Sequence, residues 1–131
     1  MIQVFTNGCF DGLHPGHLFL LGYCRALGDK LIVGINGQDY IISHKRSTPH
    51  RTQGERIADL KNLGIIDQIL IFDNDPTEII KVVQPNIYCL GEEYKDNYLA
   101  KNVCQELNIE VNFVPRVGTW SSSKMFFPAK R

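Results

Sequence analysis

Short apolar stretches with the composition of β-strands alternate along this chain with stretches of helical periodicity. Five stretches are rich in the apolar and β-branched residues of strands: 2–6 (IQVFT), 31–36 (LIVGIN), 68–72 (QILIF), 86–91 (NIYCLG) and 110–115 (EVNFVP). Runs such as LIVGI and QILIF are nearly continuously apolar rather than alternating, which suits strands that helices cover on both faces. The sequence therefore predicts an α/β fold with a doubly wound, five-stranded parallel sheet.

Helices are predicted between these strands. The predicted stretches are 16–28, 52–63, 76–83 and 97–107, and a last short helix is predicted from about Ser121. The first helix has an apolar stripe suited to packing on the sheet, formed by Leu20, Leu21, Cys24 and Leu27. Gly28 follows this stripe and is predicted to end the helix.

The composition predicts one ordinary globular domain over residues 1–131. Of the 131 residues, 44% are hydrophobic and 21% are charged, and there is no internal repeat, linker or low-complexity tract. Fourteen basic and fourteen acidic side chains balance and are scattered. This balance argues against nucleic acid or a membrane surface as a partner. Any anion site must therefore be local.

Neither a membrane span nor a signal peptide is predicted. No apolar stretch reaches the roughly 18 residues that a span requires, and MIQVFTNG lacks the basic start and the cleavage pattern of a secretory signal. We therefore expect a cytoplasmic protein. No C-x-x-C spacing occurs, so reduced and mostly buried thiols are expected at Cys9, Cys24, Cys89 and Cys104.

The segments that follow the predicted strands hold the residues best suited to chemistry. Ligands of open parallel sheets bind outside the carboxyl ends of the strands. Those ends are followed by TNGCFDGLHPGH, by an irregular basic loop at 37–53, by GEEYKDN and by PRVGTWSSSK. Glycines, cations, serines and helix N-termini at one edge suit a ligand rich in phosphate. Neither G-x-x-x-x-G-K-[ST] nor G-x-G-x-x-G is present, which disfavours a P-loop NTPase and an ordinary dinucleotide site.

The first of these segments contains the motif H-x-G-H at residues 14–17, preceded by G-x-F-D at residues 8–11. In this element the chain resembles the cytidylyltransferase-like nucleotidyltransferases, whose H-x-G-H marks the start of the first helix of a Rossmann-like fold. The resemblance extends to the basic loop at Lys45, to GERIADLKNLGIIDQILIF with Arg56, to GEEY, and to the ending with Arg116 and three serines. These four further blocks, in the same order as in the family, make the signal far more specific than a lone H-x-G-H.

Two branches of this family resemble the chain in different ways. Its length is similar to that of bacterial glycerol-3-phosphate cytidylyltransferase, whereas TNGCFDGLHPGH and IFDNDPTEIIKVVQPNIYCLGEEY look more like the adenylyltransferase domain of ADP-heptose synthases. The resemblance implies transfer of a nucleoside monophosphate from a triphosphate to a small phosphorylated alcohol or sugar, with release of pyrophosphate. CTP with an acceptor such as glycerol 3-phosphate is favoured. ATP with a sugar 1-phosphate of the heptose type, or a nucleotide-binding subunit without turnover, are the alternatives.

The resemblance also implies roles for individual residues. The reacting phosphates are assigned to His14, His17, Lys45, Arg116 and Ser122, with Mg²⁺ bridging the triphosphate oxygens. The other nucleotide contacts are assigned to Thr6, Asn7, Gly8, Cys9, Phe10, Gly16, Gly91, Glu92, Tyr94, Trp120, Ser121 and Ser123. Asp11 and Arg56 are assigned either to the acceptor or to the structure around it. A homodimer is expected from the family.

Residue chemistry supports the assignment of the two histidines. His14 and His17 are three residues apart and so lie on one face of the first helical turn. Pro15 suits the first helical position, where no N–H is needed, and Gly16 leaves room for a phosphate at the helix N-terminus. A phosphate monoester has its second pKa near about 6. The nucleophile is therefore already an anion at neutral pH, so the histidines are needed as hydrogen-bond donors rather than as bases.

Simpler explanations stay open for several of these residues. The two histidines and Cys9 could bind zinc, although no fourth ligand has a suitable spacing. Glu92 and Glu93 form either a solvated turn or a border of the ligand. The serine triplet could serve only as a helix cap, and Trp120 either stacks on the base or covers the core.

Overall fold

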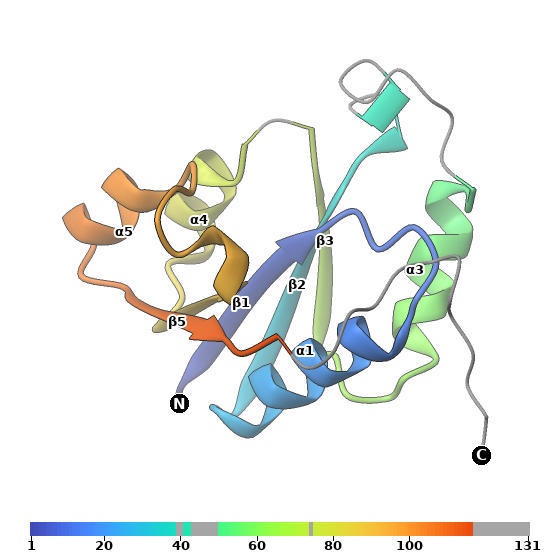
Figure 1. Cartoon of the computed structure of the whole chain (residues 1–131), viewed down its shortest axis with the longest axis horizontal. Coiled ribbons are helices and arrows are strands. Elements are labelled where there is room, and N and C mark those ends of the chain that lie inside the picture. Colours follow the sequence, from blue (N-terminus) through green and yellow to red (C-terminus); the bar gives the residue numbers. More distant parts are fainter. Residues whose placement is uncertain (39–40, 43–49, 74, 117–131) are drawn as a thin grey trace.

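The computed structural model describes residues 1–38, 41–42, 50–73 and 75–116 (Figure 1). Five parallel strands form one sheet in the order β3-β2-β1-β4-β5. The strands are β1 (Gln3–Gly8), β2 (Lys30–Asn36), β3 (Gln68–Phe72), β4 (Ile87–Gly91) and β5 (Glu110–Val114). The predicted parallel sheet is confirmed, and each of the five strands was predicted at its place in the chain.

Helices cover the sheet on both sides. They are α1 (Pro15–Ala26), α3 (Gln53–Lys61), α4 (Thr77–Val83), the 3₁₀-helix η1 (Glu92–Tyr94) and α5 (Lys101–Glu106). Successive side chains of a strand point to opposite faces. Val4 of β1 accordingly lies in one core cluster with Leu21 of α1 and Leu60 of α3. Phe5 lies in a second cluster with Ile80 of α4. The three layers confirm the doubly wound architecture (Figure 1).

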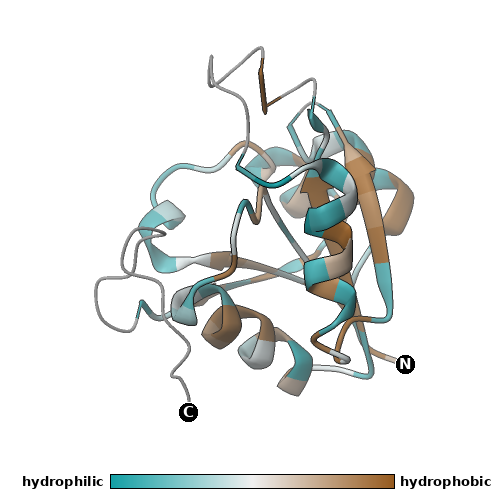
Figure 2. Ribbon diagram, turned by 90° about the vertical axis from the view of Figure 1, so that its right-hand side faces the viewer, coloured by the Kyte–Doolittle hydropathy of each residue, from teal (hydrophilic) through white to brown (hydrophobic). Residues whose placement is uncertain are grey.

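Hydrophobic residues are concentrated on the strands, whereas the helices contain both hydrophobic and hydrophilic residues (Figure 2). This distribution follows from the layers, because a strand between two helix layers meets apolar side chains on both faces. In the part of the chain that the structure describes, none of the helices has the length and apolar composition needed to cross a bilayer.

The order of the strands reverses direction between β1 and β4. From β1 the chain moves through β2 to β3 on one side, and β4 and β5 then lie on the other side of β1. Val4 is paired with Ile87 in this register, and the buried Thr6 hydroxyl donates to the Cys89 carbonyl. A crevice opens at such a reversal point, outside the carboxyl ends of the strands.

Two predicted helix ends differ from the structure. Helix α5 begins at Lys101 rather than 97: the N–H of Lys101 still bonds to the Tyr98 carbonyl three residues back, whereas the N–H of Cys104 bonds to the Ala100 carbonyl four residues back, as in an α-helix. Helix α1 ends at Ala26 with Leu27 as its C-cap, slightly before the predicted end at 28, and Gly28 follows the cap directly, where the stop was predicted. A Cβ on Gly28 would lie 2.7 Å from the Ile2 carbonyl oxygen, so this glycine permits the close approach of the segment before β1. The last helix predicted from Ser121 lies outside the described residues.

Candidate active site

A cavity of about 860 Å³ lies at the carboxyl ends of β1 and β4. Small-molecule sites have volumes of about 300 to 1,000 Å³. Twelve of the predicted site residues line it, namely Thr6, Asn7, Gly8, Cys9, Phe10, Asp11, His14, Gly16, His17, Gly91, Tyr94 and Arg116. Lys45, Trp120, Ser121, Ser122 and Ser123 lie outside the described residues. The described residues of the first loop are thus brought together with those that follow β4 and β5.

The side chains of His14 and His17 cap the N-terminus of α1. His14 is the N-cap, and its Nδ1 accepts from the backbone N–H of Gly16 at 3.1 Å and of His17 at 3.3 Å. The Nδ1 of His17 accepts in return from the His14 backbone N–H at 3.3 Å. This reciprocal pair is a capping box built from histidines rather than from the usual Ser or Thr with Glu. The imidazole rings stack, with centroids 3.8 Å apart.

These bonds determine where the imidazole protons lie. A neutral imidazole whose Nδ1 accepts a hydrogen bond carries its proton on Nε2. Burial, together with the charge of neighbouring His14, lowers the pKa of His17 to about 4, although the Gly12 carbonyl acts the other way. Burial also lowers the pKa of His14, against the effect of its own carbonyl, and the nearby Arg116 lowers it further. Both rings are therefore neutral at pH 7, and each keeps one Nε2–H donor.

Phe10 packs against the second histidine of the pair, His17. Its ring is buried and lies 5.3 Å, centroid to centroid, from the ring of His17. The backbone at Phe10 has a φ of 50°, a conformation that non-glycine residues seldom adopt. Such backbone strain is concentrated at functional sites. Phe10 was predicted to contact the nucleotide; in the structure it lines the cavity and packs against the ring of His17.

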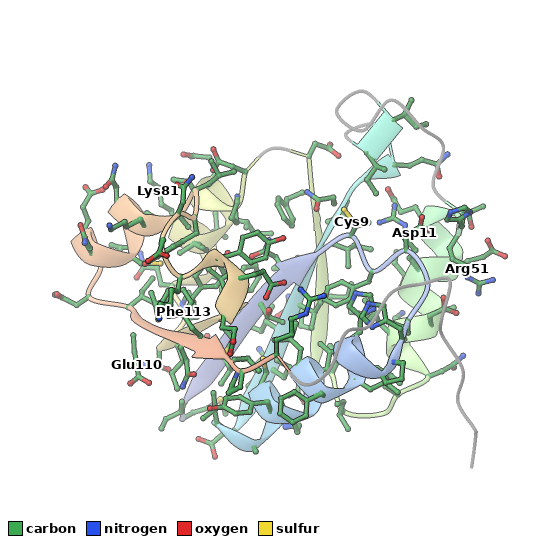
Figure 3. The ribbon with its side chains drawn as sticks, viewed as in Figure 1. Cys9, Asp11, Arg51, Lys81, Glu110 and Phe113 are labelled. Atoms are coloured by element: carbon green, nitrogen blue, oxygen red, sulfur yellow. The ribbon has the colours of Figure 1, made fainter. Side chains whose placement is uncertain are left out.

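Asp11 holds the first loop against the start of α3. Its two carboxylate oxygens accept from the backbone N–H groups of His50 at 2.8 Å and Arg51 at 2.7 Å. Figure 3 shows Asp11 beside Arg51, with Cys9 nearer to β1 in the same loop. Asp11 therefore connects two segments, which is the structural role that sequence analysis allowed for it. The thiol of Cys9 donates to Oδ1 of Asn36 at 3.4 Å.

The two consecutive glutamates of GEEY have different environments. Glu92 does not line the cavity, and its carboxylate accepts from the backbone N–H of Arg116 at 3.0 Å. Glu93 does line the cavity. Glu92 thus fixes the backbone that carries the Arg116 side chain beside His14, whereas Glu93 is available to a ligand. The sequence could not separate the two, because both follow β4 in a single turn.

Sequence analysis missed one wall of the cavity. This neutral wall consists of Pro76, Tyr88, Tyr94, Asn97, Tyr98 and Leu99, of which only Tyr94 was predicted. The Tyr88 hydroxyl donates to Oδ1 of Asn7, which joins the wall to the end of β1. The ring of Tyr98 packs against Phe113, with centroids 5.6 Å apart. A helix was predicted over 97–107, so Asn97 to Leu99 were not recognised as part of a loop facing a ligand.

Stacked neutral imidazoles at a helix N-terminus, on the reversal point of a doubly wound sheet, suit an anionic ligand such as the phosphates of a nucleotide. The model of the cytidylyltransferase-like family matches residues 5–130. The chain belongs to this family and is a nucleotidyltransferase.

The chain is also similar to curated and solved proteins. It is 35% identical to bifunctional protein HldE of Campylobacter concisus over 97% of this chain and 27% of that protein. With HldE of Aliarcobacter butzleri the identity is 36%, over 92% of this chain and 26% of that protein. The chain thus spans about a quarter of the length of these relatives.

Two solved structures resemble the fold. The lipopolysaccharide core biosynthesis protein of Thermoplasma volcanium superimposes with a TM-score of 0.72 at 26% identity, over 92% of this chain and 99% of that one. Pantoate-beta-alanine ligase of Francisella tularensis superimposes with a TM-score of 0.68 at 17% identity, over 92% of this chain and 63% of that one, and shares the fold alone.

Proposed function

We propose that the chain transfers the adenylyl group of ATP to a sugar 1-phosphate of the heptose type, releasing pyrophosphate. The sequence alone favoured CTP and glycerol 3-phosphate. Similarity to HldE proteins over 97% and 92% of this chain supports the heptose-type alternative instead. The resemblance of its first loop and of residues 71–94 to the adenylyltransferase domain of ADP-heptose synthases supports the same choice.

The observation that carries a phosphoryl-type transfer is the pair of neutral imidazoles at the N-terminus of α1. A phosphate oxygen of the acceptor attacks the α-phosphorus, the new P–O bond forms, and the bond to the bridging oxygen of pyrophosphate breaks. The acceptor is already an anion, so no proton has to be removed. The Nε2–H groups of His14 and His17 and the guanidinium of Arg116 stabilise the negative charge that develops on the phosphates.

The neutral wall suits the sugar of the acceptor. Asn97 offers an amide, and Tyr94 and Tyr98 offer hydroxyls and aromatic faces. Within the described residues, the cavity lining drawn from 88–99 has no Lys or Arg. Hydroxyl groups are bound by such neutral donors and acceptors, whereas the phosphates are bound by the histidines and Arg116. We therefore place the sugar ring against this wall.

Mg²⁺ and a second subunit are also part of the proposal. Mg²⁺ commonly binds through substrate phosphates with one or two protein carboxylates. Glu93 is a carboxylate in the cavity lining, and among the described residues no group of three or more His, Cys, Asp or Glu could hold a metal. These residues fit a cation that enters with the triphosphate and contacts Glu93. There it would neutralise phosphate charge. A homodimer remains our expectation from the family.

The experiment that tests this function is pyrophosphate release in the presence of Mg²⁺. ATP, CTP, GTP and UTP are each combined with heptose 1-phosphate, other sugar 1-phosphates, glycerol 3-phosphate, ethanolamine phosphate and phosphocholine. We expect release with ATP and the heptose 1-phosphate, and none with the same sugar lacking its phosphate. Release with CTP and glycerol 3-phosphate alone would replace the proposed substrates. If the chain binds ATP but releases no pyrophosphate with any acceptor of the panel, a nucleotide-binding subunit without turnover would be favoured.

A further inference from the structure

Arg56 is the one arginine of the described residues that is completely buried, with no exposed surface. It lies in the first half of α3, and its Nη1 donates to two backbone carbonyls, that of Cys9 at 3.0 Å and that of Asn36 at 2.7 Å. Cys9 and Asn36 both line the cavity, whereas Arg56 does not. The guanidinium therefore lies one residue behind the cavity surface, under the loop that leads to the histidines.

The positive charge of Arg56 has no counter-charge in the described part of the chain. It forms no ion pair there, and its Nε and Nη2 atoms are buried without a hydrogen-bond partner. Burying an unpaired charge is costly, and each unsatisfied polar atom adds to that cost. Outside the described residues the sequence contains one acidic side chain, Asp39. Such a cost is offset when an anionic ligand binds close by.

Arg25, an arginine with a structural role in the same chain, provides a comparison with Arg56. Its Nη1 donates to the Ile65 carbonyl and pairs with the Asp67 carboxylate at 2.7 Å. Its Nη2 donates to the Asp29 carbonyl just before β2, at the end of the sheet opposite the cavity. Arg25, like Arg56, bonds to backbone carbonyls, but its charge is matched by a carboxylate.

The bond to Cys9 also orients the loop backbone. All described peptide bonds are trans, and a trans peptide directs its C=O and its N–H to opposite sides. Because the Cys9 carbonyl faces the buried guanidinium, the N–H of the same peptide, that of Phe10, faces away from it. Cys9 and Phe10 both line the cavity. Arg56 thus helps to fix a backbone donor in the segment where phosphates would bind.

We infer that Arg56 is a positioning residue for nucleotidyl transfer: it fixes the loop at Cys9, and its charge, which no described residue matches, stabilises the phosphates bound in front of that loop. The effect acts across a few ångströms of protein, where charges interact more strongly than in water. The inference rests on the proposed function only in requiring a phosphate ligand. The base and the acceptor do not enter it.

The test compares Arg56→Lys with Arg56→Gln, because both side chains can donate to a carbonyl and only lysine is charged. Pyrophosphate is the probe, since any nucleotidyl transfer releases it. Its Kd is measured by titration calorimetry, and the rise in Tm that it causes is measured alongside. We expect Arg56→Gln to weaken the binding of pyrophosphate about tenfold or more. Arg56→Lys should retain most of the wild-type affinity. KM for the nucleotide should rise by a similar factor.

Two control variants complete the test. Arg25→Gln should lower the Tm but leave the Kd of pyrophosphate unchanged, and Asp39→Asn should change neither. An equal Kd in Arg56→Gln and Arg56→Lys would overturn the inference, as would a Tm loss in Asp39→Asn as large as in Arg56→Gln. A wild-type chain that does not bind pyrophosphate would contradict the proposed function itself, so the two failures are distinguishable.

Discussion

Helices α1 and α3 begin with the same reciprocal arrangement of hydrogen bonds, built from different side chains. At α3, the hydroxyl of Thr52 accepts from the Glu55 backbone N–H at 3.1 Å, and the Glu55 carboxylate accepts from the Thr52 N–H at 2.9 Å. At α1, His14 and His17 exchange the equivalent bonds through Nδ1. The two helices thus solve the same problem of unpaired N–H groups at their first turn.

The difference lies in what each cap leaves for a ligand. Glu55 stays negatively charged, because the Thr52 N–H and then Arg51 lower the pKa of its carboxyl, and this charge compensates the positive end of the α3 dipole. The first turn of α1 has no acidic residue, and its histidines are neutral. Helix α1 therefore keeps its positive end and two Nε2–H donors for an anion. One cap contributes only stability, and we propose that the other also binds phosphate.

His17→Ala should have the largest effect of the changes that test this comparison. The variant removes one donor to the developing phosphate charge, so turnover should fall about a hundredfold or more. Nucleotide binding should stay within roughly tenfold, because the other contacts are kept. Steady-state pyrophosphate release and nucleotide titration measure the two quantities. Turnover equal to that of the wild type would remove the role assigned to His17.

His14→Asn separates capping from ligand binding at the same residue. Asparagine is a strong N-cap, so its amide oxygen can replace Nδ1, but its shorter side chain has no donor at the position of the Nε2–H. We expect a Tm close to that of the wild type with turnover at least about tenfold lower. His14→Ala serves as the control, since it should lose turnover and about 1 kcal/mol of stability as well. Wild-type turnover in the asparagine variant would show that His14 only caps the helix.

The stability of the chain should depend on pH through His17. Its pKa is lowered to about 4 in the folded chain from an ordinary 6.5, so between these values the unfolded chain binds more protons. The free energy of unfolding therefore falls as the pH drops from 6.5 towards 4. His17→Gln, whose side chain can still close the capping box, should lose less stability over this range. Thermal unfolding at a series of pH values measures the difference, and parallel curves for the two proteins would contradict it.

Thr52→Ala should have the smallest effect on function. The loss of the hydroxyl that caps α3 should cost about 1 kcal/mol in the free energy of unfolding, as measured by urea denaturation. Turnover should change by less than about twofold, because neither Thr52 nor Glu55 lines the cavity. If turnover fell as far as in His14→Asn, the distinction between the two caps would not hold.

The sequence predicted the sheet well because all five strands are short stretches rich in apolar residues, and β2, β3 and β4 contain continuous apolar runs. It predicted the residues of the first loop for a related reason: they form one contiguous segment directly after β1. The start of α5 was predicted too early. Leu99 and Ala100 continue the apolar character of the helix towards its N-terminus, so hydrophobicity alone does not mark Lys101 as its start.

The neutral wall and the histidine bonds could not be predicted in the same way. Tyr88 and Asn7 are 81 residues apart and meet only because β4 pairs with β1. Their contact depends on strand order, which the spacing of residues does not contain. Histidine is not a usual N-cap, so no sequence pattern indicated that Nδ1 of both rings bonds to the backbone. The burial of Arg56 was equally hidden, since an arginine on a helix is normally exposed.

The central position of β1 has a consequence for how the molecule folds. Pairing with β2 involves residues close in the chain, Gln3 with Lys30, whereas the other edge of β1 pairs with β4, which begins at Ile87. During synthesis that edge has no neighbour until the ribosome has made β4, and contacts of such long sequence separation form slowly. An intermediate with β1 to β3 in place would present an open apolar edge to other chains. The cavity, whose opposite sides lie on β1 and β4, would be completed only in the last stage of folding.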